Sequence, residues 1–225
     1  MKNNLIFDTL LKLTAINLNK VFYKQKVNVI FLMRKIGLWN YNFTIISNNC
    51  WGGFVYNYFK LKYQTPFVGL FLFAPCYIKF LENFDSYINS DLVFIKANES
   101  KYKNNIETQE YPIALLDNEV EIHFLHYTSE IMAKKNWKKR SSRINKTNML
   151  VKFSDRDLCT KELIERFDNL PFNNKICFTT KKYPLKSVIF FNEQIQNDMV
   201  ENEWGVYRKY MNIKKTLNNL KRIHK

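Results

Sequence analysis

The chain has 225 residues and carries 35 Lys and Arg against 20 Asp and Glu, which gives a formal net charge of +15. This length suits a single domain that buries its own core without disulfides or structural zinc. The four cysteines are scattered and form no CxxC pair, and every apolar run is shorter than the about 20 residues of a membrane-spanning helix. These features argue against a disulfide scaffold and a membrane-spanning protein, and they predict a reduced, cytoplasmic one.

The positive charge is concentrated in residues 1–40, 130–152 and 205–225. Basic patches attract polyanions such as nucleic acid, acidic membranes or phosphorylated small molecules, although a genome rich in Lys, Asn and Ile codons is the alternative explanation. A nucleic-acid surface would also need exposed aromatic residues on which bases stack, whereas the aromatic residues here fall inside apolar periods. We therefore expect no nucleic-acid partner, and peripheral contact with the inner face of the plasma membrane is compatible with the charge.

The apolar pattern predicts a helical N-terminal appendage over residues 1–40, which ends at Gly37, and a single domain over residues 41–225. Within that domain, apolar runs of strand length alternate with amphipathic segments of helix length. The predicted strands are 41–47, 65–73, 92–97, 111–116, 120–127, 148–155, 175–180 and 187–191, and the predicted helices are 51–61, 76–88, 128–144, 161–170 and 209–223. This order favours an α/β fold: a single open, mostly parallel sheet flanked by helices, with basic helices at both termini.

The stretch SNNCWGG follows the first predicted strand, where an open α/β sheet binds its ligands. Cys50 would lie at the start of a helix, whose free N–H groups and positive dipole end stabilise an anion. Asn48 and Asn49 offer amide donors, and Gly52 and Gly53 let backbone N–H groups approach a ligand, as in an oxyanion hole or a phosphate seat. The alternative is that Cys50 is a small buried apolar residue and that the glycines only let the helix pack on the sheet.

The stretch from residue 122 to 145 carries two of the three histidines and two closely spaced arginines. His126 is the candidate base, whereas His123 is either a substrate-binding residue or a structural histidine. No metal site is expected, because an HxxH pair in a strand does not converge. Arg140 and Arg143 share a helical face and suit the recognition of phosphate or carboxylate.

Two carboxylates, Asp155 and Asp157, follow the predicted strand 148–155. The carboxyl ends of parallel strands share one edge of a sheet, so both would lie near Cys50 and bind substrate. The alternative is that this segment is a capping turn for the next helix.

Several of these segments, IISNNCWGG, HFLHY, WKKRSSRIN, SDRDLCT and LPFNNKICFT, together resemble the bacterial exopolysaccharide-biosynthesis family catalogued as domain of unknown function 1919. The resemblance runs in order from about residue 43 to residue 191, and it implies a role in surface polysaccharide assembly without a specific reaction. The turn NNCW is also similar to the Gly-Asn-Cys-Gln turn of a capsule-biosynthesis acyltransferase family that binds coenzyme A. Here Asn48 replaces the glycine and Trp51 replaces the glutamine, so Trp51 joins the candidate substrate-binding residues.

We therefore expect a transferase of capsule or exopolysaccharide biosynthesis that moves an acyl group to a sugar hydroxyl. The candidate catalytic residues are Cys50, as the nucleophile or part of an anion site, His126, as the base, and Asn49. An acyl-coenzyme A donor is the compatible cofactor. The substrate would be a saccharide or a lipid-linked saccharide, and an association with membrane-bound polysaccharide assembly machinery is compatible. One alternative is a glycosyltransferase-like enzyme in which Asp155 or Asp157 serves a metal or a hydroxyl and Arg140 serves a diphosphate. The other is a non-enzymatic basic module that docks on acidic lipid or nucleic acid.

Overall fold

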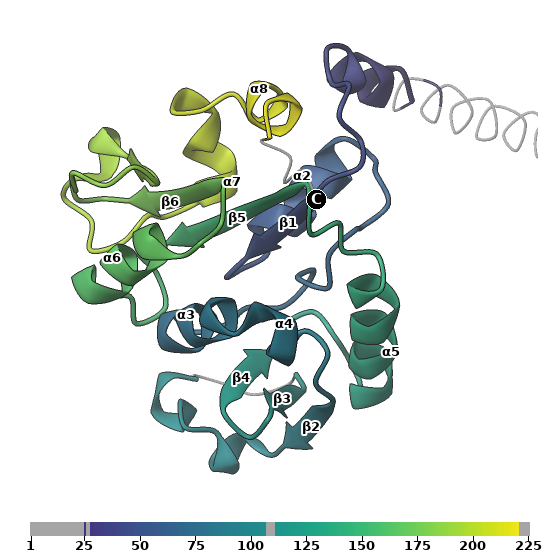
Figure 1. The fold of residues 1–225 in the computed structure, drawn as a ribbon, viewed down its shortest axis with the longest axis vertical. Helices are drawn as coiled ribbons and strands as arrows, with labels where there is room; N and C mark the ends of the chain where they lie inside the picture. Colours follow the sequence, from purple (N-terminus) through teal and green to yellow (C-terminus); the bar gives the residue numbers. More distant parts are fainter. Residues whose placement is uncertain (1–24, 26–27, 107–110, 221–225) are drawn as a thin grey trace, which may run out of the picture.

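The computed structural model describes residue 25 and residues 28–106 and 111–220, and Figure 1 shows their arrangement. Its main sheet has four parallel strands in the order β1-β5-β6-β7. These strands are β1 (Thr44–Ser47), β5 (Met149–Ser154), β6 (Lys175–Thr179) and β7 (Val188–Phe190). The register pairs Ile46 with Val151 and Phe153 with Cys177. The predicted α/β class with a parallel sheet is confirmed at this level.

Helices cover both faces of the parallel sheet, which is why its strands read as apolar runs in the sequence. Successive strand residues point to opposite faces, so Ile45 and Leu150 lie in one hydrophobic cluster, whereas Ile46 and Val151 lie in the other. The helices on the Ile45 side are α2 (Trp51–Tyr58), α7 (Glu203–Val206) and α8 (Ile213–Asn218), and those on the Ile46 side are α3 (Ala74–Glu82) and α6 (Lys161–Asn169).

A second, antiparallel sheet shows that the prediction of a single sheet is wrong. It contains β2 (Leu92–Ile95), β3 (Ile113–Leu116) and β4 (Val120–His123) in the order β2-β3-β4. Between β3 and β4, Asp117 and Asn118 have φ values of 50° and 56°, and the Glu119 N–H donates to the Leu116 carbonyl at 3.0 Å. Two successive positive φ values are typical of a tight hairpin turn, and such a turn joins antiparallel strands only.

Helix α3 lies between the two sheets (Figure 1). On one side, the Tyr77 hydroxyl donates to the carbonyls of Ile46 and Lys152 at 3.0 and 2.9 Å. On the other side, the Glu121 N–H donates to the Cys76 sulfur at 3.1 Å. Helix α3 therefore packs against both sheets and belongs to the core that they share.

Residues 65–73, predicted as a buried strand, are mostly buried but irregular. Phe67 and Leu70 are fully buried, yet only Phe71 forms a bridge, with His123 of β4. Gly69 has a φ of 73°, which interrupts an extended strand. The strand prediction is wrong because an apolar run records burial and not strand periodicity.

The remaining helices are α4 (Phe84–Tyr87), α5 (Glu130–Ser141) and the 3₁₀ helices η1 (Ala97–Glu99), η2 (Lys103–Asn105), η3 (Asn192–Gln194) and η4 (Tyr207–Lys209). The predicted helix 76–88 is thus divided between α3 and α4. Thr160 caps α6 as predicted, because its hydroxyl accepts the Leu163 N–H at 3.4 Å.

The predicted terminal helices are described only in part. Residues 28–35 are helical and end beside Gly37, whereas residues 1–24 lie outside the described part. At the other terminus, helix α8 has only six residues, so the described structure does not confirm a long basic helix over 209–223. Among the described helices, none combines the length and apolarity needed to cross a bilayer.

Candidate active site

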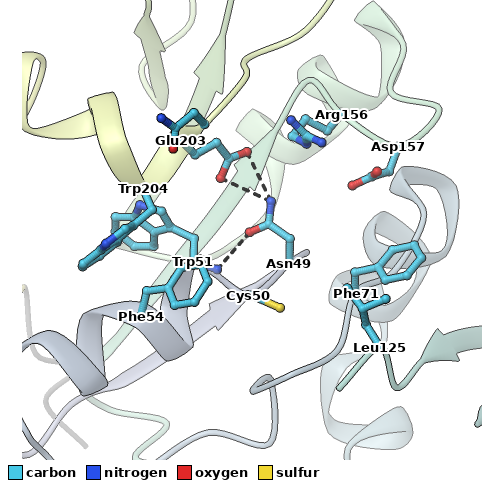
Figure 2. Close-up of a pocket in the computed structure, with 11 residues that line it drawn as sticks. Asn49, Cys50, Trp51, Phe54, Phe71, Leu125, Arg156, Asp157, Glu203 and Trp204 are labelled. Atoms are coloured by element: carbon cyan, nitrogen blue, oxygen red, sulfur yellow. Dashed lines mark hydrogen bonds between the residues drawn. The ribbon is translucent and has the colours of Figure 1, made fainter. Parts of the chain in front are cut away.

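A cleft opens where the chain leaves the carboxyl ends of β1 and β5. The next helices, α2 and α6, pack on opposite faces of the sheet, so the two loops diverge and leave a crevice between these neighbouring strands. The cleft has a volume of about 390 Å³. Its polar lining residues are Asn49, Cys50, Arg156, Asp157, Asn202 and Glu203, and its apolar ones are Trp51, Phe54, Phe71, Leu125 and Trp204. Figure 2 shows Trp204 and Phe54 on one side and Asp157 and Phe71 on the other, with Cys50 between them.

A buried ion pair fixes one wall of the cleft. The Lys152 side chain on β5 is 0% exposed, and its Nζ lies 2.5 Å from Glu203 Oε2. Asn49 Nδ2 donates to both carboxylate oxygens of Glu203 at 3.2 Å (Figure 2). Lys152 Nζ also donates to Asn48 Oδ1 and Asn49 Oδ1 at 3.4 Å. Burial lowers the pKa of Lys152, and the Glu203 carboxylate opposes that shift. Because a buried charge is costly unless it is paired, this network holds α7 and Asn49 in position against the sheet.

The first two backbone N–H groups of α2 already donate hydrogen bonds to side chains of the protein. Asn49 Oδ1 accepts the Trp51 N–H at 3.1 Å, and Ser47 Oγ accepts the Gly52 N–H at 3.2 Å. A Cβ on Gly52 would lie 2.8 Å from Ser47 Oγ and 2.9 Å from Ile45 Cγ2, whereas a Cβ on Gly53 would meet nothing closer than 3.4 Å. Gly52 therefore lets α2 pack closely on β1, as the packing interpretation of this glycine predicts. Its backbone N–H is already hydrogen-bonded and is not free to bind an oxyanion.

Cys50 lines the cleft as a neutral thiol. Its sulfur lies 3.8 Å from the Leu70 carbonyl, to which it donates. Burial raises the pKa of the Cys50 thiol, and the hydrogen bonds with the Gly69 and Leu70 backbone and the charge of Lys152 offset this shift only in part. The predicted base, His126, is exposed and donates its backbone N–H to Gly69, and it is not among the residues that line the cleft. The cleft thus brings Cys50 together with Asn49 and Asp157, but not with His126.

His123 has a structural environment inside the small sheet. The imidazole is 0% exposed, and its Nε2 lies 2.9 Å from Glu121 Oε1. The ring stacks on Phe71 with centroids 4.7 Å apart. Ser100 Oγ and the Lys101 N–H also donate to the Glu121 carboxylate. His123 therefore supports the Phe71 side of the cleft from behind.

The two arginines predicted to hold phosphate bind backbone carbonyls instead. Arg140 Nη1 donates to the Tyr127 hydroxyl at 2.6 Å and to the Val68 carbonyl at 3.4 Å. Arg143 Nη1 donates to the Tyr63 carbonyl at 3.2 Å. Arg140 therefore ties α5 to the irregular segment before α3, and Arg143 ties the residues just after α5 to Tyr63. Neither side chain lines the cleft.

Asp155 and Asp157 have different surroundings although only one residue separates them. Asp155 Oδ1 accepts the Val200 N–H at 2.8 Å, and its Oδ2 accepts the Thr180 N–H at 2.6 Å, so this carboxylate holds loops together. Asp157 lines the cleft and has a left-handed φ of 57°, a conformation that aspartate tolerates better than most residues. Burial raises the pKa of the Asp157 carboxyl; Arg156 opposes the shift and Glu203 reinforces it. The spacing Asp-x-Asp therefore presents one carboxylate to the cleft, not two.

Four residues of this site are absent from the sequence-based prediction: Lys152, Glu203, Phe54 and Trp204. A lysine inside the apolar run of strand β5 signals a buried charge that needs a partner. The partner, Glu203, lies 51 residues further along the chain, and no local pattern identifies it. Among the described residues, no group of three or more His, Cys, Asp or Glu side chains is arranged to hold a metal ion.

Two comparisons place the chain among known proteins. The family model for a domain of unknown function, DUF1919, matches residues 18–224. An uncharacterized protein of Haemophilus influenzae is 36% identical over 171 residues, which cover 76% of this chain and 75% of that protein. The predicted family is confirmed, whereas the exopolysaccharide setting stays a prediction. The chain belongs to the DUF1919 family.

Proposed function

We propose that the cleft beyond β1 and β5 is the active site of a bacterial transferase that moves an acyl group to a saccharide hydroxyl in surface polysaccharide assembly. The observation that carries this proposal is the position of Asp157. This carboxyl, with a raised pKa, lies at the crevice where open α/β sheets bind their ligands. It faces a wall of aromatic side chains across the cleft (Figure 2).

The lining of the cleft suits a sugar ring. Phe54, Phe71 and Trp204 offer flat apolar faces, against which the C–H faces of a pyranose pack. Asn49 and Asn202 add amide groups, which can exchange hydrogen bonds with hydroxyl groups. A volume of about 390 Å³ lies within the range of about 300–1,000 Å³ for small-molecule sites.

Asp157 is the proposed general base. A carboxylate whose pKa is raised accepts a proton more readily than an ordinary one. In the proposed reaction it takes the proton of the acceptor hydroxyl while that oxygen forms a bond to the acyl carbon. The bond from the acyl carbon to the donor thiol sulfur then breaks, and Asp157 returns the proton to the leaving thiolate.

The state of Cys50 favours direct transfer over an acyl-enzyme. A thiol is nucleophilic as its thiolate, and burial raises the pKa of Cys50. Its hydrogen-bond partner is a backbone carbonyl, which does not remove a proton. Cys50 is therefore proposed to shape the site and not to carry the acyl group.

Glycosyl transfer remains the second candidate, because a carboxylate beside an aromatic wall also suits a glycosyl acceptor. Its metal-dependent form is disfavoured, since Asp155 is committed to the Val200 and Thr180 amides. The two reactions differ in what they leave on the polymer, namely an ester or a sugar linkage.

The test uses the source bacterium without this gene, complemented with the wild type, Asp157→Asn or the control Asp198→Asn. Asp198 is exposed, so its substitution matches the charge change away from the site. We expect NMR of the purified surface polysaccharide to show O-acyl groups with the wild type and Asp198→Asn, and none with Asp157→Asn. Full acylation with Asp157→Asn would overturn the proposed base. A deletion that changes sugar linkages but not acyl groups would favour glycosyl transfer.

A further inference from the structure

A second hollow adjoins the candidate active site. It has a volume of about 350 Å³ and shares Phe54 and Trp204 with the cleft, so these two side chains separate the hollows. Its other lining residues are Phe31, Arg34, Asn57, Tyr58 and Arg208. A ligand that extends past Trp204 would therefore reach from one hollow into the other.

The two arginines of this hollow are stacked on aromatic rings. Arg34 Cζ lies 4.5 Å from the ring centroid of Tyr58. Arg208 Cζ lies 4.7 Å from the ring centroids of both Tyr58 and Trp204. Stacking uses the face of a guanidinium and leaves the N–H groups at its edge for a ligand. The aromatic rings thus orient both guanidiniums in advance.

Among the described residues that line this hollow are two arginines and no carboxylate. Within the part of the chain that the structure describes, no ion pair joins Arg34 or Arg208 to a carboxylate. By contrast, Arg166 on α6 donates to both oxygens of Glu82 at 2.7 and 2.8 Å. Arg34 and Arg208 stack on the same ring, so their charges lie within about 10 Å, the screening length in 0.1 M salt. An anion between them would relieve this repulsion.

We propose that Arg34 and Arg208 bind the diphosphate group of the substrate whose reactive end occupies the cleft. Guanidinium groups recognise phosphate through paired, charge-assisted hydrogen bonds. This inference rests on the proposed function and assigns one of its two substrates, the acyl donor or the saccharide acceptor, to the class of compounds that carry a diphosphate. In this proposal, Arg34 and Arg208 take the phosphate-binding role that the sequence predicted for Arg140 and Arg143. Coenzyme A thioesters, nucleotide sugars and lipid-linked sugars all carry a diphosphate, so the chemistry is shared and the source is left to experiment.

The first test measures inorganic pyrophosphate binding to the full chain by calorimetry at low salt. The variants are Arg34→Gln/Arg208→Gln and the control Arg166→Gln, which removes a charge of the same kind from α6. We expect the double variant to bind at least about tenfold more weakly, since hydrogen bonds to charged groups are among the stronger ones, and the control to bind like the wild type. Equal binding by the double variant, or no binding by the wild type, would overturn the inference. Because Arg208 is exposed, Arg208→Lys serves as a folded variant that keeps the charge and loses the planar fork, and it is expected to bind more weakly.

The second test identifies the source of the diphosphate by competition. Coenzyme A, uridine diphosphate and a short polyprenyl diphosphate each compete with pyrophosphate in separate titrations. Competition by at least one of them supports the assignment, and the tightest competitor names the source. If none competes, the site does not serve a substrate diphosphate and the inference fails.

The inference and the proposed function fail in different ways. Asp157→Asn should keep its pyrophosphate affinity, because Asp157 does not line the second hollow. Loss of pyrophosphate binding in the arginine variants, together with full acylation by Asp157→Asn, would keep the phosphate site and reject the acyl-transfer mechanism. Unchanged pyrophosphate binding in the arginine variants, together with lost acylation in Asp157→Asn, would do the reverse.

Discussion

Removing the Glu203 carboxylate should strongly destabilise the fold. The Lys152 side chain is 0% exposed. In Glu203→Gln its ammonium loses the carboxylate and keeps, among the described contacts, the amide oxygens of Asn48 and Asn49. Breaking a buried ion pair by removing one partner costs about 3–5 kcal/mol, because the remaining charge is left uncompensated. For a protein of this size, about 2–4 °C of melting temperature is lost per kcal/mol. The expected decrease in melting temperature is therefore about 6–20 °C.

A double-mutant cycle isolates the ion pair from other effects of the substitution. Lys152→Met removes the ammonium and keeps much of the side-chain volume, so Lys152→Met/Glu203→Gln no longer buries an unpaired charge. We expect the double variant to be more stable than Glu203→Gln by at least about 2 kcal/mol, in line with the near-neutral replacement of other buried ion pairs. Urea unfolding followed by circular dichroism measures all four proteins. A Glu203→Gln loss below about 1 kcal/mol, or additive losses in the double variant, would refute the argument that Lys152 is charged and dependent on Glu203.

Three further predictions follow from the geometry of the site. Gly52→Ala should destabilise the protein by about 1–3 kcal/mol, because its Cβ would overpack against Ser47 and β1. Gly53→Ala has room for its Cβ and should be neutral or stabilising. Urea unfolding measures both variants, and equal losses of stability would contradict the close packing of Gly52 on β1. Burial raises the pKa of Asp157, so the folded state binds the proton of this carboxyl more tightly than the unfolded state does. The stability that this group contributes therefore falls as the pH rises from its pKa in the unfolded state through its pKa in the folded state. Asp157→Asn should remove this loss of stability when unfolding is measured across pH, and a pH profile equal to that of the wild type would contradict the prediction. Cys50→Ser should retain most of the O-acylation measured by NMR, because direct transfer needs no thiolate; complete loss would indicate an acyl-enzyme.

The sequence by itself determined the four strands of the parallel sheet, the start of α6 and the sheet edge at which the candidate site lies. Apolar runs located β1, β5, β6 and β7, and the Thr160 cap located the start of α6. Strand and helix alternation predicted the parallel arrangement, and the rule for open α/β sheets placed Cys50 and Asp157 at one edge. These inferences succeed because periodicity, capping and the direction of parallel strands act over a few neighbouring residues.

Only the tertiary structure decided which side chains share the cleft. The Asp155 carboxylate turns to the Val200 and Thr180 amides, whereas Asp157 lines the cleft, and the sequence treats the two alike. The partner of Lys152 comes from α7, and the phosphate-binding arginines proposed here come from opposite ends of the chain. Such pairings depend on burial and on contacts between distant segments, because the cost of an unpaired buried charge arises only when packing excludes water from it.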